Sequence, residues 1–273
     1  MPPAPPPEPR PLSVPVWVPF VALLAVLVIV SLFGLAIYGV VSASDPTIKD
    51  ANDLPVGWTQ ALTFFQDLVF IFAAYIGVKL SLGSARPADF GLRRPQELKS
   101  ALGWAAAVMA GFYLVSLLLA AIFGQPEDQT LVTDLKAESG LSVLIPWAIL
   151  ICVLAPVAEE FFFRGFMFTA FSRRMGVAWA AVLDGIVFGL GHAGGAEAIQ
   201  LIALGAFGVG LCLLYWRTQS IIPGMALHAL NNSITFGVTV DLDPLLFAVV
   251  VVGSVGVVAG CATAVSARSA GAV

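Results

Sequence analysis

Residues 158–165 read Ala-Glu-Glu-Phe-Phe-Phe-Arg-Gly and lie inside an apolar run that extends from Leu141 to Phe171. That run is long enough to cross a bilayer, which takes about 20 apolar residues. Charge is expensive there, because a Glu or Arg at the centre of a membrane helix costs roughly 2.5–3.5 kcal/mol. We therefore expect the three charged side chains of this stretch to be paired or to carry a function.

Helical geometry separates the two glutamates. Glu160 and Arg164 are four residues apart, so on a helix they share a face and can form a charge-assisted pair. Glu159 points about 100° away from Glu160. The stretch predicts that Arg164 holds one Glu while the other faces a cavity. The alternative is a salt bridge that serves only helix assembly, and this stretch alone leaves that alternative open.

The composition is typical of a polytopic membrane protein. Of the 273 residues, 59% are hydrophobic and 11% are charged, and the mean hydropathy is +0.95. Soluble domains carry about 25% charged residues. The sequence has no basic stripe, which argues against nucleic acid as a partner. The cysteines lie in apolar segments without metal-type spacing, so we expect them to pack as small side chains.

Hydropathy predicts an all-α bundle of about eight transmembrane helices. The predicted spans cover residues 17–41, 58–82, 101–124, 142–171, 177–193, 197–216, 220–240 and 244–266. We divide the chain into four parts. These are a disordered proline-rich tail (1–15), three spans with their loops (16–140), a core of four spans (141–240), and the last span with its tail (241–273).

The loop charges predict how the chain lies in the membrane. With the N-terminus inside, nine Lys and Arg side chains fall on the cytoplasmic side and two, Lys49 and Lys136, on the other. The positive-inside rule thus predicts a multi-pass protein of the cell membrane with both termini cytoplasmic. Glycine pairs at four-residue spacing, 185/189 and 256/260, predict close contacts between helices.

Both histidines of the chain fall in predicted spans. His192 ends a Phe-Gly-Leu-Gly-His sequence, and His228 shares a helix face with Asn232. A lone histidine in a membrane more often makes a hydrogen bond between helices. Two of them, with a Glu pair, its Arg and an aligned Asn, favour a polar cavity instead. Asp184 fits helix packing or the cavity wall. Asp67 could line a cavity, but we favour a hydrogen bond at a helix end.

Such a set can hydrolyse a peptide bond. A carboxylate and an imidazole together can deprotonate water, and a second His with an Asn supplies donors for the oxyanion. The signatures Gly-x-Ser-x-Gly and His-Glu-x-x-His are both absent. A metal remains an alternative, because Glu159, His192 and His228 could ligate Zn²⁺ with a water in the fourth position.

Three motifs together resemble a known family. Residues 159–165, 188–192 and 228–232 are similar, in order, to the motifs of the CPBP family, also called Abi or type II CAAX prenyl protease-like intramembrane endopeptidases. The segment Gly-Leu-Arg-Arg-Pro at 91–95 also resembles one that precedes the core in bacterial members. The motifs cover about a quarter of the chain, and they are specific only in combination.

The resemblance implies an activity and a role for each motif residue. The substrate would be a membrane protein or peptide, prenylated at its C-terminus in some members, and other members are linked to bacteriocin immunity. Both metallo and glutamic mechanisms are described, and we favour water activation without a metal. The implied roles are water activation by Glu159 and His192, oxyanion stabilisation by His228 and Asn232, and positioning of Glu159 and Glu160 by Arg164.

Two rival functions remain at this point. In one, the protein is a non-catalytic membrane scaffold or immunity factor in which the polar cluster only joins helices. In the other, it is a transporter with a midplane ion site, but the sequence has no internal repeat with paired broken helices. The intramembrane endopeptidase is the function that the residues favour.

Overall fold

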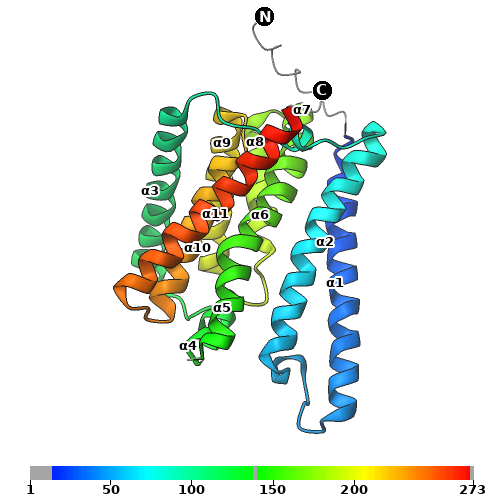
Figure 1. The fold of residues 1–273 in the computed structure, drawn as a ribbon, viewed down its shortest axis with the longest axis vertical. Coiled ribbons are helices and arrows are strands. Elements are labelled where there is room, and N and C mark those ends of the chain that lie inside the picture. Colours follow the sequence, from blue (N-terminus) through cyan, green and yellow to red (C-terminus); the bar gives the residue numbers. More distant parts are fainter. Residues whose placement is uncertain (1–13, 138–139, 271–273) are drawn as a thin grey trace, which may run out of the picture.

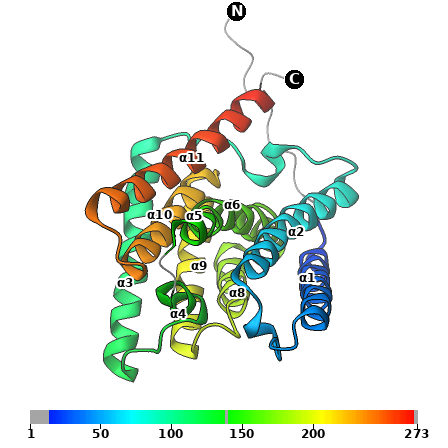
Figure 2. The same cartoon turned by 60° about the horizontal axis from the view of Figure 1, so that its bottom comes forward.

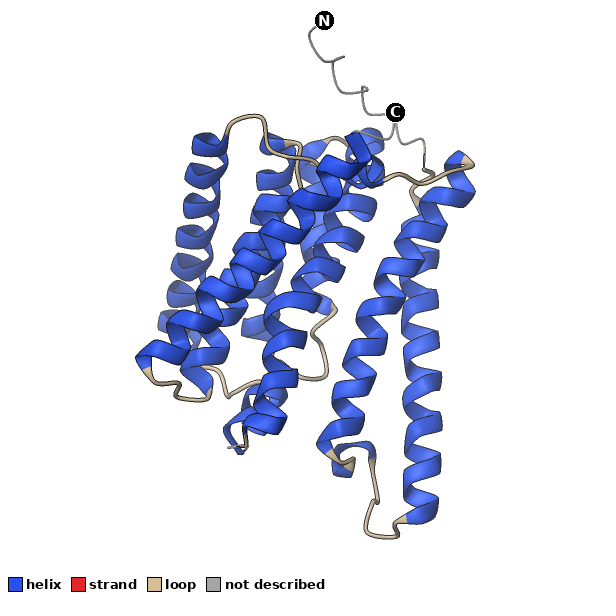
Figure 3. Ribbon diagram, viewed as in Figure 1, coloured by secondary structure: helices blue, strands red, loops and turns tan. Residues whose placement is uncertain are grey.

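The computed structural model describes residues 14–137 and 140–270, and within these ranges the chain forms helices and loops without a β-strand (Figure 3). The predicted all-α bundle is therefore confirmed. Almost all of the predicted proline-rich tail, residues 1–15, lies outside the described residues.

The long helices run roughly side by side, and α1 begins at the same end of the bundle as α11 ends (Figure 1). The first three are α1 (Trp17–Ser44), α2 (Val56–Leu82) and α3 (Leu98–Phe123). The later ones are α8 (Val177–Leu190), α9 (Ala198–Thr218), α10 (Ile222–Thr239) and α11 (Pro244–Ala270). A short helix, α4 (Thr130–Ala137), lies between the predicted spans 101–124 and 142–171, where the sequence predicts no span.

The central element is one continuous helix from Leu141 to Met175. It consists of α5 (Leu141–Ile149), α6 (Ala155–Glu160) and α7 (Thr169–Met175), joined by two π-helical segments, η3 (Leu150–Leu154) and η4 (Phe161–Phe168). Two short 3₁₀ turns, η1 (Ala51–Asp53) and η2 (Pro87–Phe90), lie in loops. Figure 2 shows α6 surrounded by α2, α8, α9 and α10.

Six helices of the described part are long and apolar enough to cross a membrane: α1, α2, α3, the central helix, α9 and α11. The other two predicted spans correspond to α8 and α10, which are shorter or more polar than these six. Helix α8 has only 14 residues, and α10 has 18 but carries His228, Asn231 and Asn232. About eight spans is thus consistent with the structure. The predicted span 177–193 ends earlier, at Leu190, so that His192 lies in the turn after α8.

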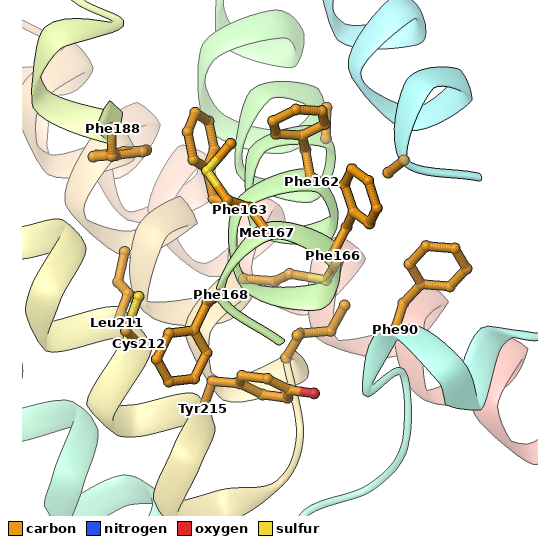
Figure 4. Close-up of a cluster of buried hydrophobic side chains, with 14 of the residues drawn as sticks. Phe90, Phe162, Phe163, Phe166, Met167, Phe168, Phe188, Leu211, Cys212 and Tyr215 are labelled. Carbon is orange, nitrogen blue, oxygen red and sulfur yellow. The ribbon is translucent and has the colours of Figure 1, made fainter. Parts of the chain in front are cut away.

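Phenylalanine side chains fix the central helix among its neighbours. The π-helical segment η4 presents a run of buried phenylalanines to α2, α8 and α9 (Figure 4). Phe162 meets Phe70 of α2 at 5.0 Å between ring centroids, and Phe163 meets Phe188 of α8 edge-on at 5.2 Å. Charges in this stretch are thereby placed in the middle of the bundle, away from lipid.

The glycine predictions divide into one that holds and one that fails. A Cβ at Gly185 would lie 2.6 Å from the carbonyl oxygen of Gly205, and one at Gly189 would lie 2.4 Å from that of Leu201. Helices α8 and α9 therefore approach as closely as the spacing predicted. For Gly256 and Gly260 the prediction was wrong, because no atom of another helix in the described part of the chain lies within 4 Å of a Cβ built at either position.

Candidate active site

A cavity of about 580 Å³ lies between the central helix and its neighbours. Four of the six predicted site residues line it, namely Glu159, His192, His228 and Asn232. They come from α6, the turn after α8, and α10, which are distant in sequence. The walls are otherwise mostly apolar, with side chains from α1, α2 and α4 completing them.

The other two predicted residues form a buried ion pair behind the cavity. Arg164 Nη1 is 2.8 Å from Glu160 Oε1, and both side chains are fully buried. Arg164 Nη2 donates to the carbonyl oxygen of Gly208 at 3.1 Å, and the guanidinium lies 4.5 Å from the ring centroid of Phe188. Asp184 Oδ1 is 3.7 Å from Arg164 Nε, so Asp184 belongs to this buried network and does not line the cavity.

His228 joins the ion pair to the cavity. Its Nδ1 is 3.2 Å from Glu160 Oε1, and its Nε2 is 3.8 Å from Glu159 Oε2. Because Glu160 is paired with Arg164, we assign the proton to Nδ1, which donates to the carboxylate. Phe188 and Phe207 flank the ring edge-on, at 5.8 and 5.7 Å between centroids. The imidazole is thus held with Nε2 on the side of Glu159.

His192 is oriented by a backbone carbonyl. Its Nδ1 lies 2.9 Å from the carbonyl oxygen of Phe188. A carbonyl oxygen only accepts hydrogen bonds, so Nδ1 carries the proton, and in the neutral ring the lone pair is on Nε2. Nε2 of His192 is therefore the nitrogen that can accept a proton from water in the cavity.

Asn232 is held by an irregularity in the central helix. Its Nδ2 donates to the carbonyl oxygen of Ile151 at 2.9 Å. That carbonyl is available because the N–H of Ala155 bonds to Leu150, five residues back, and Pro156 has no N–H to offer. One of the two Nδ2 hydrogens is used in this bond, and the other remains for a ligand.

Asp67 takes the less favoured of the two places that the sequence suggested for it. It is 3% exposed, lies in the middle of α2 and lines the cavity, and its Oδ2 has no hydrogen-bond partner among the described residues. The predicted hydrogen bond at a helix end was therefore wrong. The signal that favours the cavity is the same as for Glu159, an acidic residue in the middle of an apolar span.

The donors for the zinc alternative are not gathered as a ligand set. Within residues 14–137 and 140–270, no three His, Cys, Asp or Glu side chains are grouped so as to hold one metal ion. Each histidine bonds through Nδ1 within the protein, His192 to Phe188 and His228 to Glu160, so Nε2 is the nitrogen with which either ring would ligate a metal. We derive no chemical step through a metal.

Comparison with known proteins agrees with the resemblance noted in the motifs. Residues 141–234 match the family described as type II CAAX prenyl endopeptidase Rce1-like, and this segment contains all six predicted site residues. The resemblance is confirmed over that segment. A Bacillus subtilis (strain 168) protein named "Putative membrane peptidase YdiL" is 27% identical over 143 residues. The alignment covers 50% of this chain and 56% of that relative, so the chain spans just over half the relative's length. No solved structure matches the chain.

Proposed function

We propose that this multi-pass membrane protein, whose segment 141–234 is Rce1-like, is an intramembrane endopeptidase that cleaves a membrane-associated protein or peptide. One observation carries the proposal. Glu159, His192, His228 and Asn232 come from three separate elements and line a single cavity inside the bundle. Four polar side chains at membrane depth are too costly to be accidental.

The first proposed step is activation of water. A water in the cavity would give a proton to the Glu159 carboxylate or to Nε2 of His192 while its oxygen attacks the carbonyl carbon of the scissile bond. The same proton would then pass to the amide nitrogen as the carbon–nitrogen bond breaks. The products are a carboxylate and an amine, and no other reactant is needed.

The second element is stabilisation of the oxyanion. With a proton on each ring nitrogen, His228 would donate from Nε2 to the oxyanion, while Glu160 accepts from Nδ1. The free Nδ2 hydrogen of Asn232 would be the second donor. Removal of one such donor in other hydrolases costs about 10²–10³ in kcat, which sets the scale expected here.

Localisation and orientation follow from the same proposal. The apolar helices place the protein in a membrane. We place both termini in the cytoplasm, because α1 begins and α11 ends at one end of the bundle (Figure 1), where most bases of the loops also lie. The accessibility of reporter tags at either terminus in intact cells and in inverted vesicles tests this orientation.

The decisive experiment uses conservative variants. Membrane proteomes of strains that carry wild-type protein, Glu159→Gln or His192→Gln are compared, and candidate substrates are then cleaved with purified protein. We expect both variants to lose cleavage by about 10²–10⁴-fold while they insert and fold normally. Glu97→Gln, a change at an exposed position outside the cavity, is the matched control. Full cleavage by Glu159→Gln would refute the proposed water activation by Glu159. Membrane proteomes that do not differ between wild type and either variant, with no cleavage by the purified wild-type protein, would leave the non-catalytic scaffold.

A further inference from the structure

A second cavity, of about 200 Å³, lies at the end of the bundle where α7 stops. It is separate from the candidate active site, and four segments form it: the turn η2 with the residues after it, the end of η4 with α7, the first residue of α8, and the end of α9. The polar side chains of its lining are Asp89, Arg93, Thr169, Ser172, Arg173, Tyr215 and Gln219. No step of the proposed reaction uses any of them.

The structure holds Arg93 firmly in place at this cavity. Gly91 has a φ of +71°, and a Cβ on it would lie 2.4 Å from Cε2 of Tyr215, so only glycine fits there. The carbonyl of Gly91 accepts from the N–H of Ile221 at 3.0 Å, and the hydroxyl of Ser220 donates to the carbonyl of Arg93. The Gly-Leu-Arg segment is thus fastened to the turn between α9 and α10.

The cavity carries an excess of positive charge. Nε of Arg93 is buried without a hydrogen-bond partner among the described residues, and Arg173 is exposed at the end of α7. Neither forms a salt bridge within the described part of the chain. Among the described residues that line the cavity, Asp89 is the only one with a carboxylate, and its Oδ1 lies 3.7 Å from Nη2 of Arg86.

The hydroxyl of Tyr215 completes the donor set. Tyr215 lies beside Phe168 (Figure 4), and both Arg93 and Arg173 are near enough to its hydroxyl to interact with it electrostatically. The hydroxyl of Ser172 also lines the cavity, but it donates to the carbonyl oxygen of Thr169 at 3.3 Å. Two guanidinium groups with an adjacent hydroxyl match a tetrahedral anion, because arginine donates to phosphate oxygens in a planar fork.

We propose that this cavity binds a phosphate group. Its position supports this ligand, because it lies at the basic end of the bundle, and basic pockets between helices at a membrane surface bind the head groups of anionic lipids. The phosphate would come either from the head group of an anionic phospholipid or from a free phosphate in solution.

The test compares two charge-matched double variants. Arg93→Gln/Arg173→Gln removes the charges that line the cavity. Arg94→Gln/Arg174→Gln removes the neighbouring charges, which are exposed and do not line it. Purified protein in neutral detergent is titrated with phosphatidylglycerol or phosphatidylcholine and followed by native mass spectrometry, and separately with inorganic phosphate by calorimetry.

We expect wild-type protein to bind phosphatidylglycerol or inorganic phosphate in preference to phosphatidylcholine. The cavity variant should bind about 25-fold more weakly, at roughly fivefold for each guanidinium, and the control less than threefold more weakly. Equal weakening in both variants, or no binding of either ligand, would overturn the proposal. If loss of the Arg93 bond to the carbonyl of Ala88 impairs folding, Arg173→Gln alone should still weaken binding about fivefold.

Discussion

The buried guanidinium of Arg164 is the interaction whose removal should be most costly. In Arg164→Gln, the carboxylate of Glu160 stays fully buried with the His228 imidazole as its one remaining hydrogen-bond donor. The bond to the carbonyl of Gly208 is also lost, as is the stacking on Phe188. Breaking a buried pair by removing one partner costs about 3–5 kcal/mol, and we expect a loss of stability in that range.

Replacement of the other partner, Glu160, should lower stability less. This difference between the two variants is the stricter test of the reasoning. Glu160→Gln leaves Arg164 with its bond to Gly208 and with Asp184 Oδ1 at 3.7 Å as a second carboxylate. We therefore expect Glu160→Gln to lower the free energy of unfolding by about 1–3 kcal/mol, which is what a hydrogen bond to a charged group contributes. The double variant Glu160→Gln/Arg164→Gln should lose less stability than the two single variants together, by about 1–3 kcal/mol, because both partners of the ion pair are removed at once.

The assay is unfolding in mixed micelles, with increasing sodium dodecyl sulfate and helix content followed by circular dichroism. Arg174→Gln is the matched control, an exposed arginine on the same helix for which we expect a change within about 0.5 kcal/mol. The reasoning would be refuted by an Arg164→Gln protein no less stable than Glu160→Gln, since Asp184 would then contribute nothing to the network.

Three further outcomes are expected. Gly189→Ala should destabilise by about 1–3 kcal/mol, because its Cβ meets backbone at 2.4 Å, whereas Gly256→Ala, with open space, should be neutral in the same unfolding assay. Pro156→Ala adds an N–H that competes for the carbonyl holding Asn232, so kcat should fall about tenfold with KM unchanged; unchanged kcat would contradict the proposed role of that carbonyl. Asp67→Asn should raise stability by about 1 kcal/mol, since it removes a buried carboxyl group with an unpaired oxygen, and a lower unfolding midpoint would show that this acid is satisfied.

Interactions within one helix could be predicted from the sequence, because spacing alone determines which side chains are neighbours. The ion pair of Glu160 with Arg164 could be predicted because residues four apart lie on the same face of a helix. The rotation of about 100° between successive residues places Glu159 on another face, toward the cavity. The bundle as a whole followed from hydropathy. These inferences required no knowledge of how one helix is rotated against the next.

Contacts between different helices could not be predicted in this way. The approach of Asp184 to Arg164 depends on the depth and rotation of α8 relative to the central helix, which the glycine contacts with α9 determine. Asp67 likewise joins the cavity only because α2 packs on the central helix through Phe70. Spacing within either segment contains no information about these distances.

The π-helical segment η3 shows how a local rule acquires a long-range consequence. Proline in an apolar helix predicts an unbonded carbonyl but does not say which side chain will reach it. Here the carbonyl of Ile151 is bonded by Asn232, 81 residues later in the chain, so the irregularity fixes an amide on the wall of the cavity. A regular α-helix through Leu150–Ala155 would use that carbonyl internally. The departure from regular geometry is therefore what allows the central helix to orient a residue of α10.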